Sequence, residues 1–172
     1  MNNKVRYIAL TGLMAAVIAV ISVWQIPLPF GVPLTFQVFA VALSGYVLGR
    51  GRGVLATFIY IAVGCVGIPV FTGFLGGIGV ILGGSGGFIA GFLAVSFLCG
   101  LGKSKGPLGA VLLGLAGTAV CHITGAAWYA LVTGSRIASA FLVSSLPYIA
   151  KDALLVVLAY VLSRTIVKRI KL

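Results

Sequence analysis

Long apolar segments alternate with short breaks along almost the whole chain. The pattern predicts six helices, at about residues 5–24, 35–48, 54–66, 88–101, 108–132 and 147–167. A run of about 20 apolar residues is long enough to cross a bilayer. The sequence therefore predicts an all-α integral membrane protein, with six transmembrane helices packed as one domain over residues 1–172.

The breaks between these segments differ in composition. Residues 25–33 contain three prolines, and a helix does not continue through such a run. Residues 67–87 are rich in glycine, and residues 133–146 are expected to form a connecting loop. Tight basic turns are predicted at residues 50–53 and 103–107. The order is thus helix, proline break, two helices, glycine-rich stretch, and three further helices.

Composition supports a membrane location. Of the 172 residues, 61% are hydrophobic and 8% are charged, whereas a soluble domain has about 25% charged residues. The net charge of +11 comes from small basic groups between the apolar segments. That distribution is typical of topology signals rather than of a nucleic-acid-binding surface, so we expect no nucleic-acid partner.

The basic residues also predict an orientation. With six crossings, both termini share one side with the turns after the second and fourth helices. Positive residues mark the cytoplasmic side, so both termini are predicted to be cytoplasmic, in a bacterial-type plasma (inner) membrane. Ten of the twelve basic residues fall on that side: Lys4, Arg6, Arg50, Arg52, Lys103, Lys105, Arg164, Lys168, Arg169 and Lys171.

Asp152, the only acidic side chain of the protein, lies in the last predicted helix beside Lys151. At 1.5 Å per residue it is placed roughly 8 Å below the outer surface. Ionisable groups inside a membrane usually face an interior cavity and mark a functional site. In the alternative interpretation, Lys151 extends outward to the interface and Asp152 has a structural partner.

The glycine-rich stretch is predicted to lie on the same outer side. Eleven of the 25 glycines fall between residues 64 and 91. Irregular backbone at membrane depth is tolerated where it is buried in protein or lines a cavity, so we expect this stretch and Asp152 to form one pocket open to the outside. Helix packing is the alternative for Gly87 and Gly91, which have the GxxxG spacing.

Other candidate chemistry is sparse. A single acid cannot provide both a magnesium ligand and a base for ATP hydrolysis, and no nucleophile–base pair is visible. We therefore expect neither an enzyme nor a bound cofactor, and energy for transport would come from another protein. His122 is isolated in the sequence and is interpreted as a core residue rather than a metal ligand. Trp128 and Tyr129 lie either at the interface or in the pocket wall.

Several segments together resemble the BioY family, the biotin-specific substrate-binding (S) components of energy-coupling-factor (ECF) transporters. The glycine-rich GGIGVILGGSGGFIAGF and the PYIAKD segment that ends at Asp152 are the most specific. Leu155 stands where the family commonly has a lysine, and Lys151 is the candidate replacement. The similar segments cover residues 26–37, 67–71, 76–92, 125–128 and 147–152.

The resemblance implies a high-affinity biotin-binding bundle that docks on a transmembrane coupling protein with two ATPase subunits. Ala15 and Ala19 match the docking motif of the first helix, although internal packing explains such a small-residue face equally well. The alternatives are binding of another vitamin, and a passive channel or structural membrane protein in which the glycines serve only packing. Whether the protein forms a homo-oligomer is left open. The expected binding residues are Asp152, Lys151, Ser85, Gly76, Gly77, Gly79, Phe71, Phe74, Trp128 and Tyr129.

Overall fold

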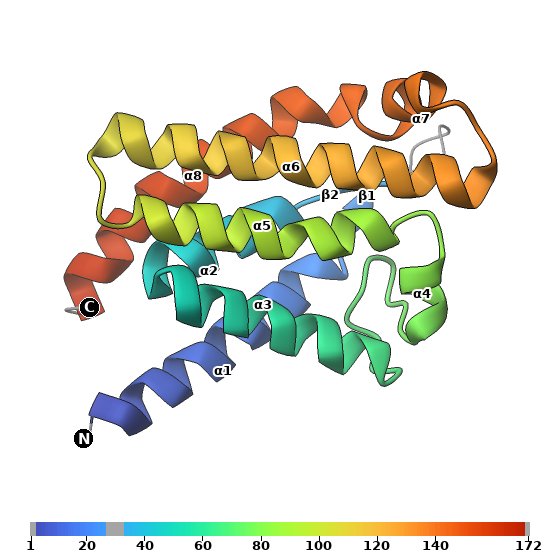
Figure 1. Cartoon of the computed structure of the whole chain (residues 1–172). Helices are drawn as coiled ribbons and strands as arrows, with labels where there is room; N and C mark the ends of the chain where they lie inside the picture. Colours follow the sequence, from blue (N-terminus) through green and yellow to red (C-terminus); the bar gives the residue numbers. More distant parts are fainter. Residues whose placement is uncertain (1–2, 27–32, 171–172) are drawn as a thin grey trace.

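The computed structural model describes residues 3–26 and 33–170, which contain eight helices and two short strands (Figure 1). In chain order the first five elements are α1 (Asn3–Ser22), β1 (Gln25–Ile26), β2 (Leu34–Thr35), α2 (Gln37–Leu48) and α3 (Arg50–Cys65). They are followed by α4 (Ile78–Leu82), α5 (Gly86–Gly102), α6 (Pro107–Thr133), α7 (Ile137–Ser144) and α8 (Leu146–Ile170).

The all-α fold expected from the sequence is confirmed. The six predicted helices correspond to α1, α2, α3, α5, α6 and α8. By length and composition three of them can cross a membrane, namely Lys4–Ser22 within α1, α6 and α8. The apolar helices α2 and α5 are shorter. The number of crossings therefore stays a prediction.

Three local predictions were wrong. The basic turn expected at residues 50–53 is the first turn of α3, because Gly49 alone reverses the chain with a φ of 82°, a conformation that suits glycine. The glycine-rich stretch contains α4, and the expected connecting loop at residues 133–146 contains α7. Both added helices are shorter than the window of about 11–18 residues over which a helical pattern of apolar residues is recognised.

The proline-rich break is flanked by a small hairpin. Gln25 pairs with Thr35 and Ile26 with Leu34 in antiparallel register. Residues 27–32, which carry two of the prolines, lie outside the described residues. The hairpin matters for the site because Gln25, Pro33 and Thr35 all line the cavity described below.

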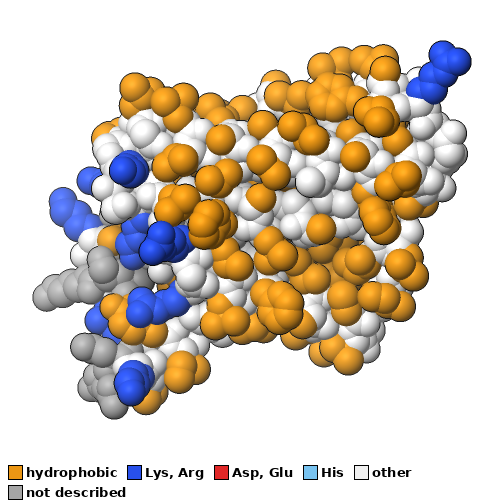
Figure 2. Space-filling model, viewed as in Figure 1, with side chains coloured by type: hydrophobic (Ala, Val, Ile, Leu, Met, Phe, Trp, Pro, Cys, Tyr) orange, Lys and Arg blue, Asp and Glu red, His pale blue; other side chains and the backbone are white. Residues whose placement is uncertain are grey.

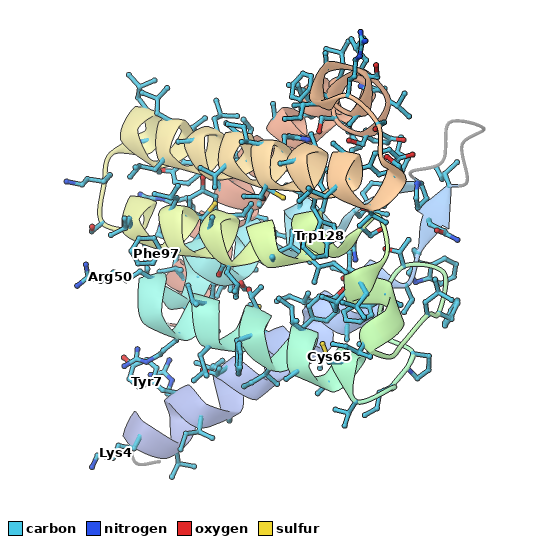
Figure 3. The ribbon with its side chains drawn as sticks, turned by 45° about the vertical axis from the view of Figure 1, so that its right-hand side comes forward. Lys4, Tyr7, Arg50, Cys65, Phe97 and Trp128 are labelled. Atoms are coloured by element: carbon cyan, nitrogen blue, oxygen red, sulfur yellow. The ribbon has the colours of Figure 1, made fainter. Side chains whose placement is uncertain are left out.

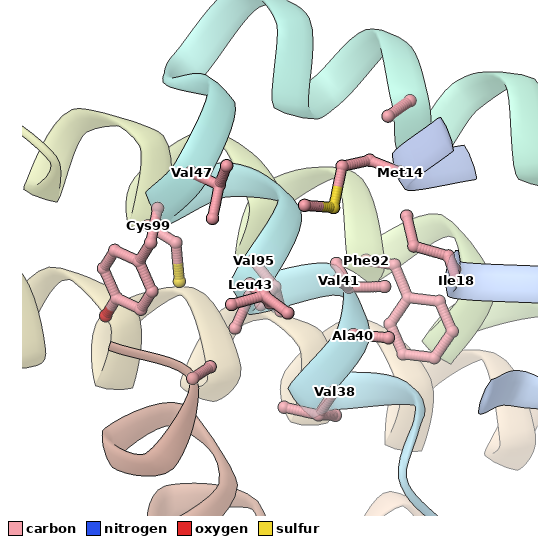
Figure 4. Close-up of a cluster of buried hydrophobic side chains, with 14 of the residues drawn as sticks. Met14, Ile18, Val38, Ala40, Val41, Leu43, Val47, Phe92, Val95 and Cys99 are labelled. Carbon is pink, nitrogen blue, oxygen red and sulfur yellow. The ribbon is translucent and has the colours of Figure 1, made fainter. Parts of the chain in front are cut away.

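Helix α2 forms the centre of the bundle and packs against α1, α3, α5 and α8. Figure 4 shows side chains of this core: Met14 and Ile18 come from α1, Val41 and Val47 from α2, and Val95 from α5.

Glycines bring α2, α3 and α5 unusually close together. A Cβ added to Gly53 on α3 would lie 2.7 Å from Gly45 Cα on α2. A Cβ on Gly45 would collide with the backbone carbonyl of Ser96 on α5. Small residues of this kind allow membrane helices to approach backbone to backbone.

The surface divides into apolar sides and a basic end. Figure 2 shows hydrophobic side chains over most of the visible face, with Lys and Arg gathered where the two termini lie. In Figure 3, Lys4, Tyr7 and Arg50 lie at that end, and Trp128 lies nearer the other. Arg6 donates to the carbonyl of Ile170 and Arg52 stacks over the Tyr7 ring, so α1 is tied to α8 and α3 there.

Candidate binding site

A cavity of about 280 Å³ lies at the end of the bundle opposite the termini. It is enclosed by the hairpin, the loop after α3, and parts of α2, α4, α5, α6, α7 and α8. Side chains that line it include Gln37, Phe71, Val80, Ser85, Phe88, Phe92, His122, Ser144, Tyr148, Lys151 and Asp152. A mostly apolar wall with a few polar groups is typical of a small-molecule site.

The charged groups of the cavity form one cluster. Asp152 is only 4% exposed, and its Oδ1 lies 2.6 Å from Lys151 Nζ. Lys151 also donates from Nζ to the Thr35 carbonyl at 2.7 Å, which joins α8 to β2. On the other side, His122 Nε2 of α6 lies 3.4 Å from Asp152 Oδ2. Three elements thus hold one carboxylate inside the bundle.

Several polar atoms of this cluster have unused hydrogen-bonding capacity. Among the described residues, His122 Nδ1 and Ser144 Oγ have no hydrogen-bond partner. His122 Nε2 has only its 3.4 Å contact with Asp152 Oδ2, and Asp152 Oδ1 has only its ion pair with Lys151. Buried polar groups are normally hydrogen-bonded, and an unsatisfied one requires an explanation. Since these atoms belong to residues that line the cavity, a polar ligand there is the simplest explanation.

The opposite wall is built from α2, α3 and the loop that follows α3. Gln37 donates from Nε2 to the Tyr60 hydroxyl at 3.0 Å, and the Thr35 hydroxyl donates to Gln37 Oε1 at 3.3 Å. The Tyr60 ring meets the Phe71 ring edge-on at 5.6 Å. Gly64 of α3 makes room for Phe71, because a Cβ there would collide with the ring.

Of the three glycines expected to contact a ligand, Gly76 and Gly77 shape the loop beside the cavity. A Cβ on Gly76 would lie 2.6 Å from the Ile68 carbonyl oxygen. Gly77 has a φ of 95° and donates its backbone N–H to the Gly64 carbonyl at 2.7 Å. Gly79 lies in α4 and a Cβ there would meet open space. The cavity is lined next to these glycines by Leu75 and Val80 rather than by them.

The structure brings together four of the expected binding residues and leaves the other aromatics outside. Asp152, Lys151, Ser85 and Phe71 line the cavity. Phe74 is 63% exposed on the surface.

Trp128 and Tyr129 contact the glycine-rich backbone behind the wall. Trp128 donates from Nε1 to the Gly83 carbonyl at 2.9 Å. The Tyr129 ring lies 3.1 Å from the position of a Cβ on Gly84. These two side chains therefore support the segment that carries Ser85.

Sequence reasoning missed several cavity residues. His122 was interpreted as a satisfied core residue, but it faces Asp152 and its ring meets Phe88 edge-on at 6.1 Å. Neither Gln37 nor Tyr148 was among the expected binding residues. A buried glutamine in an apolar helix and a tyrosine one turn before Asp152 were the signals available for them.

The two alanines expected at a docking surface point inward. Ala15 is 6% exposed and belongs to the hydrophobic core, and Ala19 packs against that core. The exposed small residues of α1 are Ala9, Gly12 and Ala16, and the last two are also four residues apart. Groups of three or more His, Cys, Asp or Glu side chains that could hold a metal do not occur among residues 3–26 and 33–170.

Comparison with known proteins agrees with this architecture. A protein of Pyrococcus horikoshii described as a probable biotin transporter BioY is 41% identical over 87% of this chain and 88% of its own length. A biotin transporter BioY of Rhizobium etli is 31% identical over 94% of this chain and 92% of its own.

A crystal structure of the S-component for biotin from an ECF-type ABC transporter superposes with a TM-score of 0.89 at 27% identity. It covers 98% of this chain and 94% of that one. The sequence profile of the BioY family matches residues 1–172, so the chain belongs to the BioY family.

Proposed function

We propose that this protein is the biotin-binding S component of an ECF-type transporter. The observation that carries the proposal is the buried cluster of Asp152, Lys151 and His122, whose hydrogen-bonding capacity is not fully used, in the wall of a mostly apolar cavity. Membership of the BioY family and the names of its relatives support biotin as the ligand.

The chemistry of biotin suits the cluster. Its ureido ring carries two N–H donors and a carbonyl acceptor. Asp152 supplies an ionised acceptor, and Lys151 and His122 supply donors. Hydrogen bonds to charged groups are stronger than neutral ones. The same three side chains can therefore satisfy the ureido ring and leave few of their own polar atoms unpaired.

The rest of biotin suits the remaining walls. Phe71, Phe88 and Phe92 can cover the thiophane ring and the aliphatic tail. Ser85 is exposed, lines the cavity, and directly precedes the first residue of α5. Its hydroxyl and the positive end of the helix dipole suit the ligand carboxylate.

The same proposal includes the membrane arrangement. Helices α1, α2, α3, α5, α6 and α8 would cross the bilayer, with both termini cytoplasmic and the cavity facing outside. The gathering of basic side chains at the end that holds the termini supports this orientation. ATP hydrolysis would come from partner subunits, because a chain with one acidic side chain lacks the groups for it.

Calorimetric titration of the purified full chain with biotin tests the function, with thiamine and riboflavin as controls. We expect selective binding of biotin without any partner protein. Equal or tighter binding of thiamine or riboflavin would assign the cavity to another vitamin. Absence of binding to all three would favour a structural membrane protein.

Docking onto a coupling protein is a further part of the proposal, and α1 allows a sharp test. Because Ala16 is exposed and Ala15 is in the core, Ala16→Trp should block association with the ATPase module and leave biotin affinity unchanged. Ala15→Trp should instead lower the melting temperature, since overpacking typically costs about 1–3 kcal/mol.

The measurements are co-purification with the module, biotin affinity and thermal unfolding of both variants. An Ala16→Trp protein that still assembles normally would show that this face of α1 is not the docking surface.

A further inference from the structure

A second hollow, of about 880 Å³, lies at the basic end of the bundle between the ends of α2, α5 and α8. Its wall carries four basic side chains: Lys103, Arg164, Lys168 and Arg169. None of the described residues that line it is acidic, and the protein's single carboxylate side chain, Asp152, belongs to the cavity at the other end. Among the described residues, no acidic side chain therefore balances these basic groups.

The basic groups are placed by the fold rather than by sequence proximity alone. Arg164 and Lys168 are four residues apart on α8, so they lie on one face of the helix. Lys103 directly follows α5, and its Nζ donates a 2.7 Å hydrogen bond to the Val47 carbonyl of α2. Burial and the neighbouring Arg52 guanidinium lower the pKa of Lys103. An anion in the hollow would relieve this repulsion.

The inner wall holds an unsatisfied polar group as well. Tyr160 lines the hollow and is 8% exposed, and its hydroxyl lacks a hydrogen-bond partner among the described residues. Its ring packs edge-on against Tyr46 at 5.4 Å. The Tyr46 hydroxyl already donates its hydrogen bond, to the Ala110 carbonyl at 2.9 Å. Tyr160 thus offers a free donor at the base of a basic hollow.

Apolar surface continues from the hollow along α8. Val161 is exposed and lies three residues before Arg164, so both are on the same side of the helix. Val167 also lines the hollow. A ligand with an anionic head and a hydrocarbon tail can contact both kinds of surface, whereas a free anion can use only the first.

We infer that this hollow binds the phosphate head group of an anionic phospholipid, with the basic side chains around the phosphate and an acyl chain beside α8. The inference rests on the proposed membrane orientation, which places the basic end in the cytoplasmic leaflet, and not on biotin as the substrate. Basic pockets between helices on that side are suited to such head groups.

The test is native mass spectrometry of the full chain in detergent, titrated separately with phosphatidylglycerol and phosphatidylcholine. We expect the wild type to prefer phosphatidylglycerol. The double variant Arg164→Gln/Lys168→Gln should bind it about 25-fold more weakly, since each basic side chain contributes roughly a factor of five. Arg50→Gln/Lys105→Gln is the matched control, because it removes the same charge from exposed positions that do not line the hollow.

Competition with inorganic phosphate identifies the source of the phosphate, and we expect that it does not displace the lipid. Tyr160→Phe tests the role of the hydroxyl: it should weaken phosphatidylglycerol binding with little change in side-chain volume. Biotin affinity should stay unchanged in every variant, because the cavity lies at the other end; failure of biotin binding in the wild type would concern the proposed function alone.

Four results would overturn the inference. The first is equal binding of the two lipids by the wild type. The second is an equal loss of lipid binding in the matched control, which would indicate general surface attraction. The third is displacement of the lipid by phosphate alone, which would indicate that the hollow binds a soluble anion. The fourth is a double variant that keeps its lipid and loses the ATPase module, which would indicate that the hollow binds a partner protein.

Discussion

Replacing Asp152 by asparagine is expected to weaken biotin binding by at least about tenfold, or roughly 1.4 kcal/mol. Asparagine keeps the size of the side chain but removes the only carboxylate of the cavity. Its amide would present donors to the ligand's ureido N–H groups. Lys151 would also lose the counter-charge that lies 2.6 Å from its Nζ. Calorimetric titration of the variant with biotin measures the effect.

A structural role of Asp152 makes a different prediction. If the carboxylate only neutralises Lys151, the double variant Lys151→Met/Asp152→Asn should recover the affinity that Asp152→Asn loses. If Asp152 contacts the ligand, the double variant stays weak. Ser163→Ala is the control on the same helix, because the Ser163 hydroxyl donates to the Tyr160 carbonyl, well away from the cavity. Unchanged biotin affinity in Asp152→Asn would remove Asp152 from the binding site.

The second large effect is expected from Gly53→Ala, which should destabilise the fold by about 1–3 kcal/mol through overpacking. The added Cβ would lie 2.7 Å from Gly45 Cα, 3.0 Å from Gly45 N and 3.0 Å from the Ser44 carbonyl oxygen. All three are backbone atoms of α2, so no side chain can move away. The helices would have to separate, and α2 also packs against α1, α5 and α8.

Gly51→Ala provides a matched control two residues away on the same helix. A Cβ at Gly51 meets nothing within 4 Å, and alanine is the better helix former by about 0.5–1 kcal/mol. Thermal unfolding in detergent should therefore give a lower melting temperature for Gly53→Ala and an equal or higher one for Gly51→Ala. Equal melting temperatures for the two variants would contradict the close backbone contact.

Some features could be predicted from the sequence because they depend on local or one-dimensional properties. Apolar segments of sufficient length predict helices in any tertiary context, and α6 and α8 begin within one residue of their expected starts. The isolation of Asp152 and its pairing with Lys151 in an apolar helix predicted the polar centre of the candidate site. Breaks rich in proline or glycine were placed correctly, although the short helices α4 and α7 within the expected loops were missed.

Other features depend on how each helix is rotated and which residues approach from distant segments. The sequence spacing of Ala15 and Ala19 matches that of Gly12 and Ala16, and only packing turns the first pair inward and leaves the second exposed. Likewise, His122 meets Asp152, 30 residues later in the chain, because α6 and α8 pack together.

The sequence by itself thus determined the membrane class, the main helices and the one buried carboxylate, since these follow from composition and local periodicity. The tertiary structure decided which polar side chains surround that carboxylate and which of the expected aromatic residues lie outside the cavity. It also decided that Lys103 lies beside the basic residues of α8 in the second hollow. Helical periodicity fixes the relative angle between residues of one helix, whereas its rotation toward its neighbours is set by side-chain packing across the whole bundle.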